Sequence, residues 1–205
     1  MRKVITIGRE FGSGGRLLGR TLADYLGLAY YDKEIITEIA NRTQLSEDYV
    51  KNVVESHPSP LLPVTVGRSF NPMGNPMFQI TQSVYAEQTK IIKEMAENSD
   101  CVIVGRCADY ILREMKPWRI FVYADMESKM DRHRKRDPDV SSLTDKELRQ
   151  KIIQMDKGRA KYYEFYTGNK WGDKVNYDVC INTSGIDIVK HVPHIAHMYE
   201  CMDVR

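Results

Sequence analysis

The chain has few cysteines, and none has the spacing of a redox or haem-attachment motif. The four cysteines, Cys101, Cys107, Cys180 and Cys201, form no CxxC pair within the 205 residues. This argues against a dithiol or a haem-attachment site. Three of the four stand in or beside short apolar runs, where free cysteine behaves as a small hydrophobic residue. We therefore expect reduced cysteines in the core of a cytoplasmic protein.

An excess of one charge and long hydrophobic runs are also absent. The 30 basic residues nearly balance the 28 acidic ones, so the whole-chain charge predicts neither a nucleic-acid polymer nor a membrane as a partner. No stretch approaches the roughly 18 apolar residues of a membrane span. The first apolar run stops at Gly8, which is too short for the core of a signal peptide. We expect a soluble, cytoplasmic protein whose electropositive site is local.

Short apolar runs alternate with helical patterns along the chain. The runs predict strands over residues 4–7, 29–31, 101–104, 120–123 and 179–181. The helical patterns cover residues 15–26, 33–42, 46–56, 79–97, 106–115, 126–136, 145–166 and 186–201. This alternation predicts an α/β fold with a parallel sheet that is covered by helices on both faces. Ligand sites in such sheets lie at the carboxyl ends of the strands.

Two connections are too long for a simple crossover between neighbouring strands. Residues 33–98 separate the second and third predicted strands, and residues 126–177 separate the fourth and fifth. We interpret both as mobile subdomains inserted into one domain. The first contains the proline-rich stretch 57–78, whose lack of periodicity predicts an irregular, mobile segment.

The glycine-rich stretch "REFGSGGRLLG", residues 9–19, follows the first predicted strand. Glycines let backbone N–H groups converge on an anion, and a helix that starts near Gly15 directs its dipole to the same place. The stretch therefore predicts a phosphate-binding loop. When Gly15-Arg16 is set on the Gly-Lys of GxxxxGK[ST], Glu10 takes the place of the first glycine and Leu17 that of the metal-binding hydroxyl. The stretch therefore matches this phosphate-loop pattern only in part.

Two other interpretations of this stretch stay open from the loop alone. The dinucleotide pattern GxGxxG fits Gly12 and Gly14 but requires glycine or alanine at Leu17, and Asp32 stands where that pattern places a ribose-binding acid. An NAD-dependent oxidoreductase would use these residues. The second alternative is a turn without a ligand, but Arg16 in the first helical turn opposes the dipole unless an anion lies between them.

Clustered arginines favour phosphoryl transfer over hydride transfer. Arg159 interrupts the apolar stripe of the helix predicted near the carboxyl end of the second insertion, and residues 129–136 hold five cations, Arg132 among them. Arg106 directly follows the third strand, with Asp109 one helical turn later. Positioned cations stabilise the charge on a moving phosphoryl group. These positions therefore predict a kinase-like site.

Five motifs, "ITIGREFGSGGR", "YYDKEII", "VIVGRCADYIL", "DKGRAKYYEFYTGNKW" and "NYDVCINTS", closely resemble the cytidylate-kinase-like proteins, a branch related to nucleoside monophosphate kinases. The resemblance spans nearly the whole chain. It implies a three-layer P-loop α/β fold with a five-stranded parallel sheet in a single kinase domain. The implied parts are a core of residues 1–32, 99–125 and 174–205, an insertion over 33–98 that binds the nucleoside monophosphate, and a helical lid over 126–173.

The resemblance also implies roles for individual residues. The phosphate loop comprises Gly12, Ser13, Gly14, Gly15, Arg16 and Leu17; the monophosphate site contains Asp32, Arg106 and Asp109; and the lid carries Arg132, Asp156 and Arg159. Among these, Arg16, Arg132 and Arg159 are expected to neutralise charge during transfer, and Asp156 to orient Arg159.

The implied cofactors are ATP and Mg²⁺, and the implied partner is a nucleoside monophosphate, with CMP or dCMP favoured. Leucine at position 17 removes a usual metal contact, so the protein ligand of Mg²⁺ is not identified. A catalytically silent nucleotide-binding protein and a kinase of another small acceptor remain alternatives. The sequence does not indicate the oligomeric state.

Overall fold

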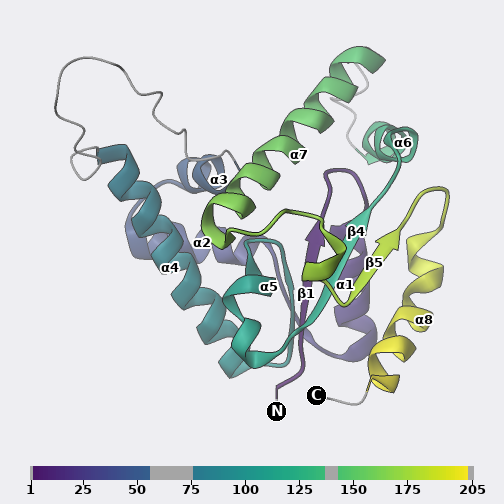
Figure 1. The fold of residues 1–205 in the computed structure, drawn as a ribbon, viewed down its shortest axis with the longest axis horizontal. Coiled ribbons are helices and arrows are strands. Elements are labelled where there is room, and N and C mark those ends of the chain that lie inside the picture. The colour runs from purple at the N-terminus through teal and green to yellow at the C-terminus, as the bar shows by residue number, and fades with distance from the viewer. Residues whose placement is uncertain (1, 56–75, 137–142, 203–205) are drawn as a thin grey trace.

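The computed structural model describes residues 2–55, 76–136 and 143–202 and has one parallel sheet at its centre (Figure 1). Its strands are β1 (Val4–Arg9), β2 (Ala29–Tyr31), β3 (Cys101–Val104), β4 (Trp118–Tyr123) and β5 (Val179–Asn182). They lie in the order β2-β3-β1-β4-β5, and all pairings are parallel. The predicted five-stranded parallel sheet is therefore confirmed.

Helices cover both faces of this sheet, because successive side chains of a strand point to opposite faces. Val4 of β1 packs into the core beneath α2 (Lys33–Thr43), α3 (Glu47–Glu55), α4 (Pro76–Asn98) and α5 (Ala108–Ile111). Ile5 and Ile7 pack into the opposite core, beneath α1 (Gly15–Leu26) and α8 (Ile188–Cys201). Within the described ranges, no helix is both long and apolar enough to cross a membrane.

Two further helices, α6 (Met126–Arg136) and α7 (Asp145–Thr167), lie beyond the carboxyl ends of the strands (Figure 1). A capping box of Thr144 and Glu147 starts α7, as the sequence predicts. Leu148 and Ile152 of α7 pack against Phe11, which belongs to the loop after β1, and against residues of α6. The carboxyl half of α7 joins the core beneath α2 and α4. This long helix therefore connects the glycine-rich loop to the far side of the sheet.

Two predicted helix boundaries are wrong, and each has a local cause. The helix expected over 106–115 begins only at Ala108, because Arg106 and Cys107 adopt left-handed backbone, with φ of 59° and 54°, and it breaks at Leu112. Only α5 and a 3₁₀ turn, η2 (Arg113–Met115), remain of it. Helix α4 begins three residues before the expected start at 79, at Pro76, since proline is well tolerated in the first helical position. Residues 57–75 of the proline-rich stretch lie outside the described residues.

The expectation that all cysteines lie in the core is wrong for two of them. Cys101 and Cys107 are buried, whereas Cys180 and Cys201 are exposed. Cys180 lies on β5, an edge strand whose alternate residues face outward. Cys201 ends α8.

Close packing of α1 on the sheet depends on Gly19. A Cβ at this position would lie 2.9 Å from Cγ2 of Val104 and 3.1 Å from Cδ1 of Ile7. We predict that Gly19→Leu lowers the free energy of unfolding by about 1–3 kcal/mol, although leucine is the better helix former. Urea denaturation measures the effect. The matched control is Asp24→Leu on the exposed face of α1, with an expected change within about 0.5 kcal/mol. Equal stability of the two variants would contradict the packing explanation.

Candidate functional site

The glycine-rich loop connects β1 to α1 at the carboxyl edge of the sheet. Gly12 and Gly14 have φ of 80° and 81°, a conformation that side chains rarely allow. Gly14 is also the N-cap of α1, and the structure shows no side-chain cap there and no acidic residue in the first turn. The first N–H groups of a helix need partners, and together with the dipole they favour an anion. Backbone geometry therefore supports a phosphate loop.

Two side chains from elements distant in sequence hold this loop in place. The Thr183 hydroxyl donates to the Ser13 carbonyl at 2.6 Å. The Arg132 guanidinium donates to the carbonyl of Gly12 at 3.4 Å and to the carbonyl of Thr183. Arg132 of α6 thus connects the loop to the segment after β5.

A buried ion-pair cluster joins the same loop to α6 and α7. Lys129 Nζ lies 2.6 Å from a carboxylate oxygen of Glu10 and 3.0 Å from one of Asp156. The other Asp156 oxygen accepts the backbone N–H of Phe11 at 2.6 Å. Burial raises the pKa of Asp156, whereas the Phe11 hydrogen bond and the charges of Lys129 and Arg159 lower it. Asp156 therefore positions the loop; that it also orients Arg159 stays a prediction.

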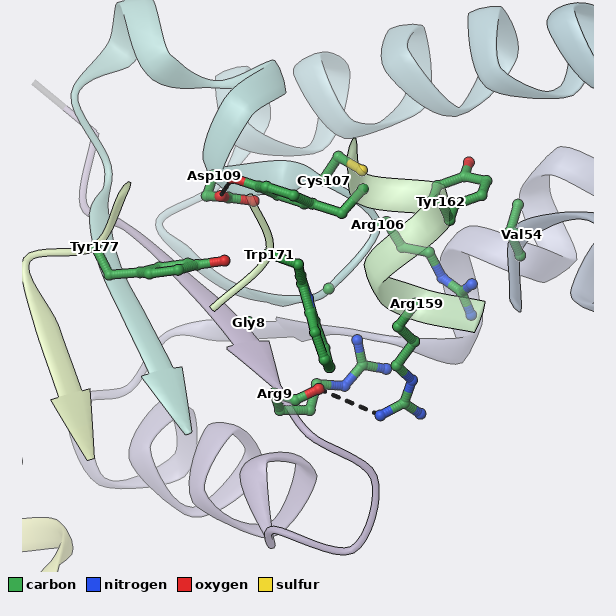
Figure 2. Close-up of a pocket in the computed structure, with 12 residues that line it drawn as sticks. Gly8, Arg9, Val54, Arg106, Cys107, Asp109, Arg159, Tyr162, Trp171 and Tyr177 are labelled. Carbon is green, nitrogen blue, oxygen red and sulfur yellow. Dashed lines mark hydrogen bonds between the residues drawn. The ribbon is translucent and has the colours of Figure 1, made fainter. Parts of the chain in front are cut away.

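Four arginines from four different elements gather in front of the loop. Arg9 ends β1, Arg16 stands in the first turn of α1, Arg106 follows β3 and Arg159 comes from α7. Asp32, at the start of α2, lies with one oxygen 2.8 Å from Arg16 Nε and the other 3.6 Å from Arg9 Nη2. The Arg159 guanidinium donates to the Arg9 carbonyl at 3.3 Å (Figure 2).

The electrostatics of this arginine cluster favour an anion. Burial and the positive charge of Arg159 lower the pKa of Arg9 far below its usual range; Arg106 and Arg16 lower it further, and Asp32 raises it. Arginine nevertheless stays protonated in proteins, so the repulsion persists. Asp32 offsets part of this repulsion through its pairs with Arg9 and Arg16. A bound phosphate would offset more of it.

Two cavities meet at the arginine cluster. The larger, of about 640 Å³, lies against the loop and is lined by residues that include Gly12, Gly14, Arg16, Leu17, Arg132 and His133. The smaller, of about 40 Å³, lies deeper at the edge of the sheet and is lined mainly by Arg106, Asp109 and aromatic side chains (Figure 2). Arg9 and Arg159 line both cavities. They therefore stand between the loop and the inner pocket.

The inner pocket is aromatic and contains one buried carboxyl group. Asp109 accepts a hydrogen bond from the Tyr163 hydroxyl at 2.7 Å. Burial raises the pKa of Asp109, so this group keeps its proton to higher pH than an exposed aspartate does. Figure 2 shows the Trp171 ring beside Arg9 and the Tyr177 ring on the Asp109 side of the pocket. The pocket thus combines flat apolar surfaces with a few polar groups.

The structure brings the residues expected from the sequence to one region. The loop residues, Arg132 and Arg159 surround the larger cavity, Arg106 and Asp109 line the smaller one, and Asp32 pairs with two of the arginines. Sequence reasoning did not select Arg9 or Glu10. The available signal was a pair of opposite charges at the end of a buried strand, directly before the glycines.

The strand order argues against the oxidoreductase interpretation. In the dinucleotide-binding fold the second strand lies next to the first. Here β3 separates β2 from β1. Asp32, the expected ribose-binding acid at the end of β2, is ion-paired with Arg9 and Arg16.

Comparison with known proteins supports the kinase interpretation. A curated cytidylate kinase from Methanopyrus kandleri is 24% identical over 191 residues, which cover 88% of this chain and 84% of the relative. An uncharacterised protein from Eubacterium ventriosum has a similar structure, with a TM-score of 0.69, 27% identity and coverage of 98% of this chain and 99% of the other. The shikimate kinase from Bacteroides thetaiotaomicron shares the fold, with a TM-score of 0.57, 18% identity and coverage of 97% and 98%.

The model of the cytidylate kinase-like family matches residues 4–185, which include the glycine-rich loop, all four arginines and both long insertions. A match over this length, together with the parallel P-loop-type sheet, is sufficient to assign the family. The chain therefore belongs to the cytidylate kinase-like family.

Proposed function

We propose that the protein is an ATP-dependent kinase that transfers the γ-phosphoryl group of Mg-ATP to a nucleoside monophosphate, with CMP or dCMP as the favoured acceptor. The observation that carries this proposal is the arginine cluster between the loop cavity and the inner pocket. Several guanidinium groups at the border of two cavities suit a phosphoryl group that passes from one cavity to the other. Family membership and the likeness to a cytidylate kinase support the choice of acceptor.

The larger cavity is suited to ATP, the donor of the phosphoryl group. Its volume of about 640 Å³ is within the range of about 300–1,000 Å³ that small-molecule sites occupy. The glycines of the loop and the start of α1 present backbone N–H groups to this space. The loop over residues 10–14 is held by hydrogen bonds to Arg132, Thr183 and Asp156, so its shape exists before a nucleotide binds.

Among the described residues, the surroundings of the loop offer no cluster of side-chain ligands for Mg²⁺. Leu17 has no hydroxyl group, and Glu10 and Asp156 are paired with Lys129. Within the described part of the chain, no three metal-ligating side chains are grouped. We therefore assign Mg²⁺ to the phosphate oxygens and water. When bound in this way, it neutralises charge on the triphosphate.

Transfer in this site needs positioning more than acid–base chemistry. The acceptor phosphate is already anionic near neutral pH, so the chain supplies no base. Arg106 would bind the acceptor phosphate, and Arg159 would bind the phosphoryl group while its bond to the leaving ADP breaks and its bond to the acceptor oxygen forms. The helices α6 and α7 would exclude water, which otherwise competes as an acceptor. The inner pocket, at about 40 Å³, is smaller than a nucleoside base, so we propose that it opens when the acceptor binds and that Trp171 and its tyrosines then contact the base.

Phosphoryl transfer to a panel of acceptors tests the proposed function. The panel comprises CMP, dCMP, UMP, AMP and GMP, with shikimate as a small hydroxyl acceptor and a reaction without acceptor as the control for hydrolysis. We expect rapid formation of CDP or dCDP, far above the control. Transfer to shikimate alone would identify a different small-molecule kinase. Nucleotide binding without any transfer would identify a catalytically silent protein, and either result would contradict the proposal.

Removal of the lid arginine tests how charge is neutralised. We predict that Arg159→Ala lowers kcat for the favoured acceptor by about 10²-fold or more. The reason is that a preorganised hydrogen-bond donor stabilises the charge that develops in the transition state. Steady-state kinetics measure the change. The control is Arg149→Ala, which removes an exposed arginine from the same helix and should leave kcat unchanged. An unchanged kcat in Arg159→Ala would remove Arg159 from the mechanism.

A further inference from the structure

The backbone of the glycine-rich loop indicates how the loop should be aligned with the phosphate-loop pattern, which the sequence alone leaves open. Gly14 is the last residue of the loop with left-handed backbone, and Gly15 is the first residue of α1. If Gly14 is aligned with the second glycine of GxxxxGK[ST], then Arg9 is aligned with the first glycine and Gly15 with the lysine. In this register, the two positions at which the pattern requires glycine and lysine carry arginine and glycine.

The two exchanged positions are neighbours in space. A Cβ on Gly15 would lie 2.5 Å from Cβ of Arg9 and 3.1 Å from its Cγ. A lysine at position 15 therefore cannot coexist with the observed path of the Arg9 side chain. At its other end, the Arg9 guanidinium lies against Gly105, where a Cβ would overlap Nη1. Glycines at both places leave room for one long cationic side chain.

The charged end of Arg9 is placed to meet a ligand. The Arg9 side chain is 10% exposed and lines both cavities. Its Nε has no hydrogen-bond partner among the residues that the structure describes, and Asp32 lies at 3.6 Å from Nη2. Arg16 Nε likewise has no hydrogen-bond partner among the described residues. However, the Arg16 side chain is 35% exposed, its Nε lies 2.8 Å from Asp32, and it lines the larger cavity but not the smaller one. A buried donor without a partner is costly unless a ligand supplies one.

We propose that Arg9 is the cation of this phosphate loop and binds the transferred phosphoryl group in place of the loop lysine. Arg16 instead holds Asp32 against Arg9 and keeps the Arg9 guanidinium in position. The inference rests on the proposed kinase function for its catalytic consequence but not for the binding of phosphate. Arg9 forms no covalent bond; its N–H groups donate to phosphoryl oxygens while the bond to ADP breaks and the bond to the acceptor forms.

Exchanging the two residues tests this inference. Arg9→Gly should lower kcat by about 10²-fold or more, and the double variant Arg9→Gly/Gly15→Lys should recover at least tenfold of that loss. A structural role of Arg9 does not predict rescue by a lysine from the other element. The control is Arg42→Gln, which removes an arginine paired with Glu94 on the surface and should change kcat less than twofold. Activity of Arg9→Gly near that of the wild type, or no rescue, would overturn the inference.

Binding of inorganic triphosphate separates this inference from the kinase proposal, because it needs no acceptor. By calorimetry, the wild type should bind triphosphate, Arg9→Gly should bind it at least tenfold more weakly, and the double variant should regain affinity. If Arg9→Gly does not fold, Arg9→Met replaces it in the experiment, because methionine retains the apolar part of the side chain. Arg9→Lys is the conservative variant and should still bind triphosphate. Absence of phosphoryl transfer with this binding pattern intact would refute only the kinase proposal. Triphosphate affinity that does not depend on Arg9 would refute the inference itself.

Discussion

Repulsion between the buried guanidinium of Arg9 and the arginines around it is the constraint on which the rest of this site depends. Arg9 is almost fully buried with Arg159, Arg106 and Arg16 nearby, and Asp32 pairs with two of these four arginines. Burying a charge is expensive unless a partner compensates for it. A phosphate group has the charge and the acceptor oxygens to compensate for this cluster, and the proposed function supplies one.

The topology brings the cluster together, and long-range contacts keep the loop in shape. The strands β1 and β3 are neighbours and parallel, so Arg9 and Arg106 meet at one edge of the sheet. Helix α7 passes over the same edge and adds Arg159 (Figure 1). Lys129 pairs with Glu10, which lines the larger cavity, and with Asp156. It thereby offsets the charge of two carboxylates that lie close to the proposed phosphate loop. Without that lysine, both would repel the ligand.

Much of the fold was predictable from the sequence, because strands buried on both faces are continuous apolar runs and helices carry a 3.6-residue period. The left-handed backbone at Arg106 and Cys107, which delays the start of α5, was not predictable, because neither residue type is typical of that conformation. In the site, glycines and arginines indicated a phosphate loop and a lid. The role of Arg9 was hidden, since it depends on the space left by Gly15 and Gly105, and Gly105 is distant in sequence. The Lys129–Glu10 pair joins residues more than a hundred positions apart.

The central claim is that the arginine cluster binds the phosphoryl group at the end of the loop. A crystal structure with a non-hydrolysable ATP analogue tests it most directly. We predict that the terminal phosphate accepts hydrogen bonds of about 3 Å from the Arg9 guanidinium and from the backbone N–H groups of residues 12–15, with Arg159 on its far side. A terminal phosphate bound away from Arg9, with the guanidinium still facing only Asp32, would contradict the account.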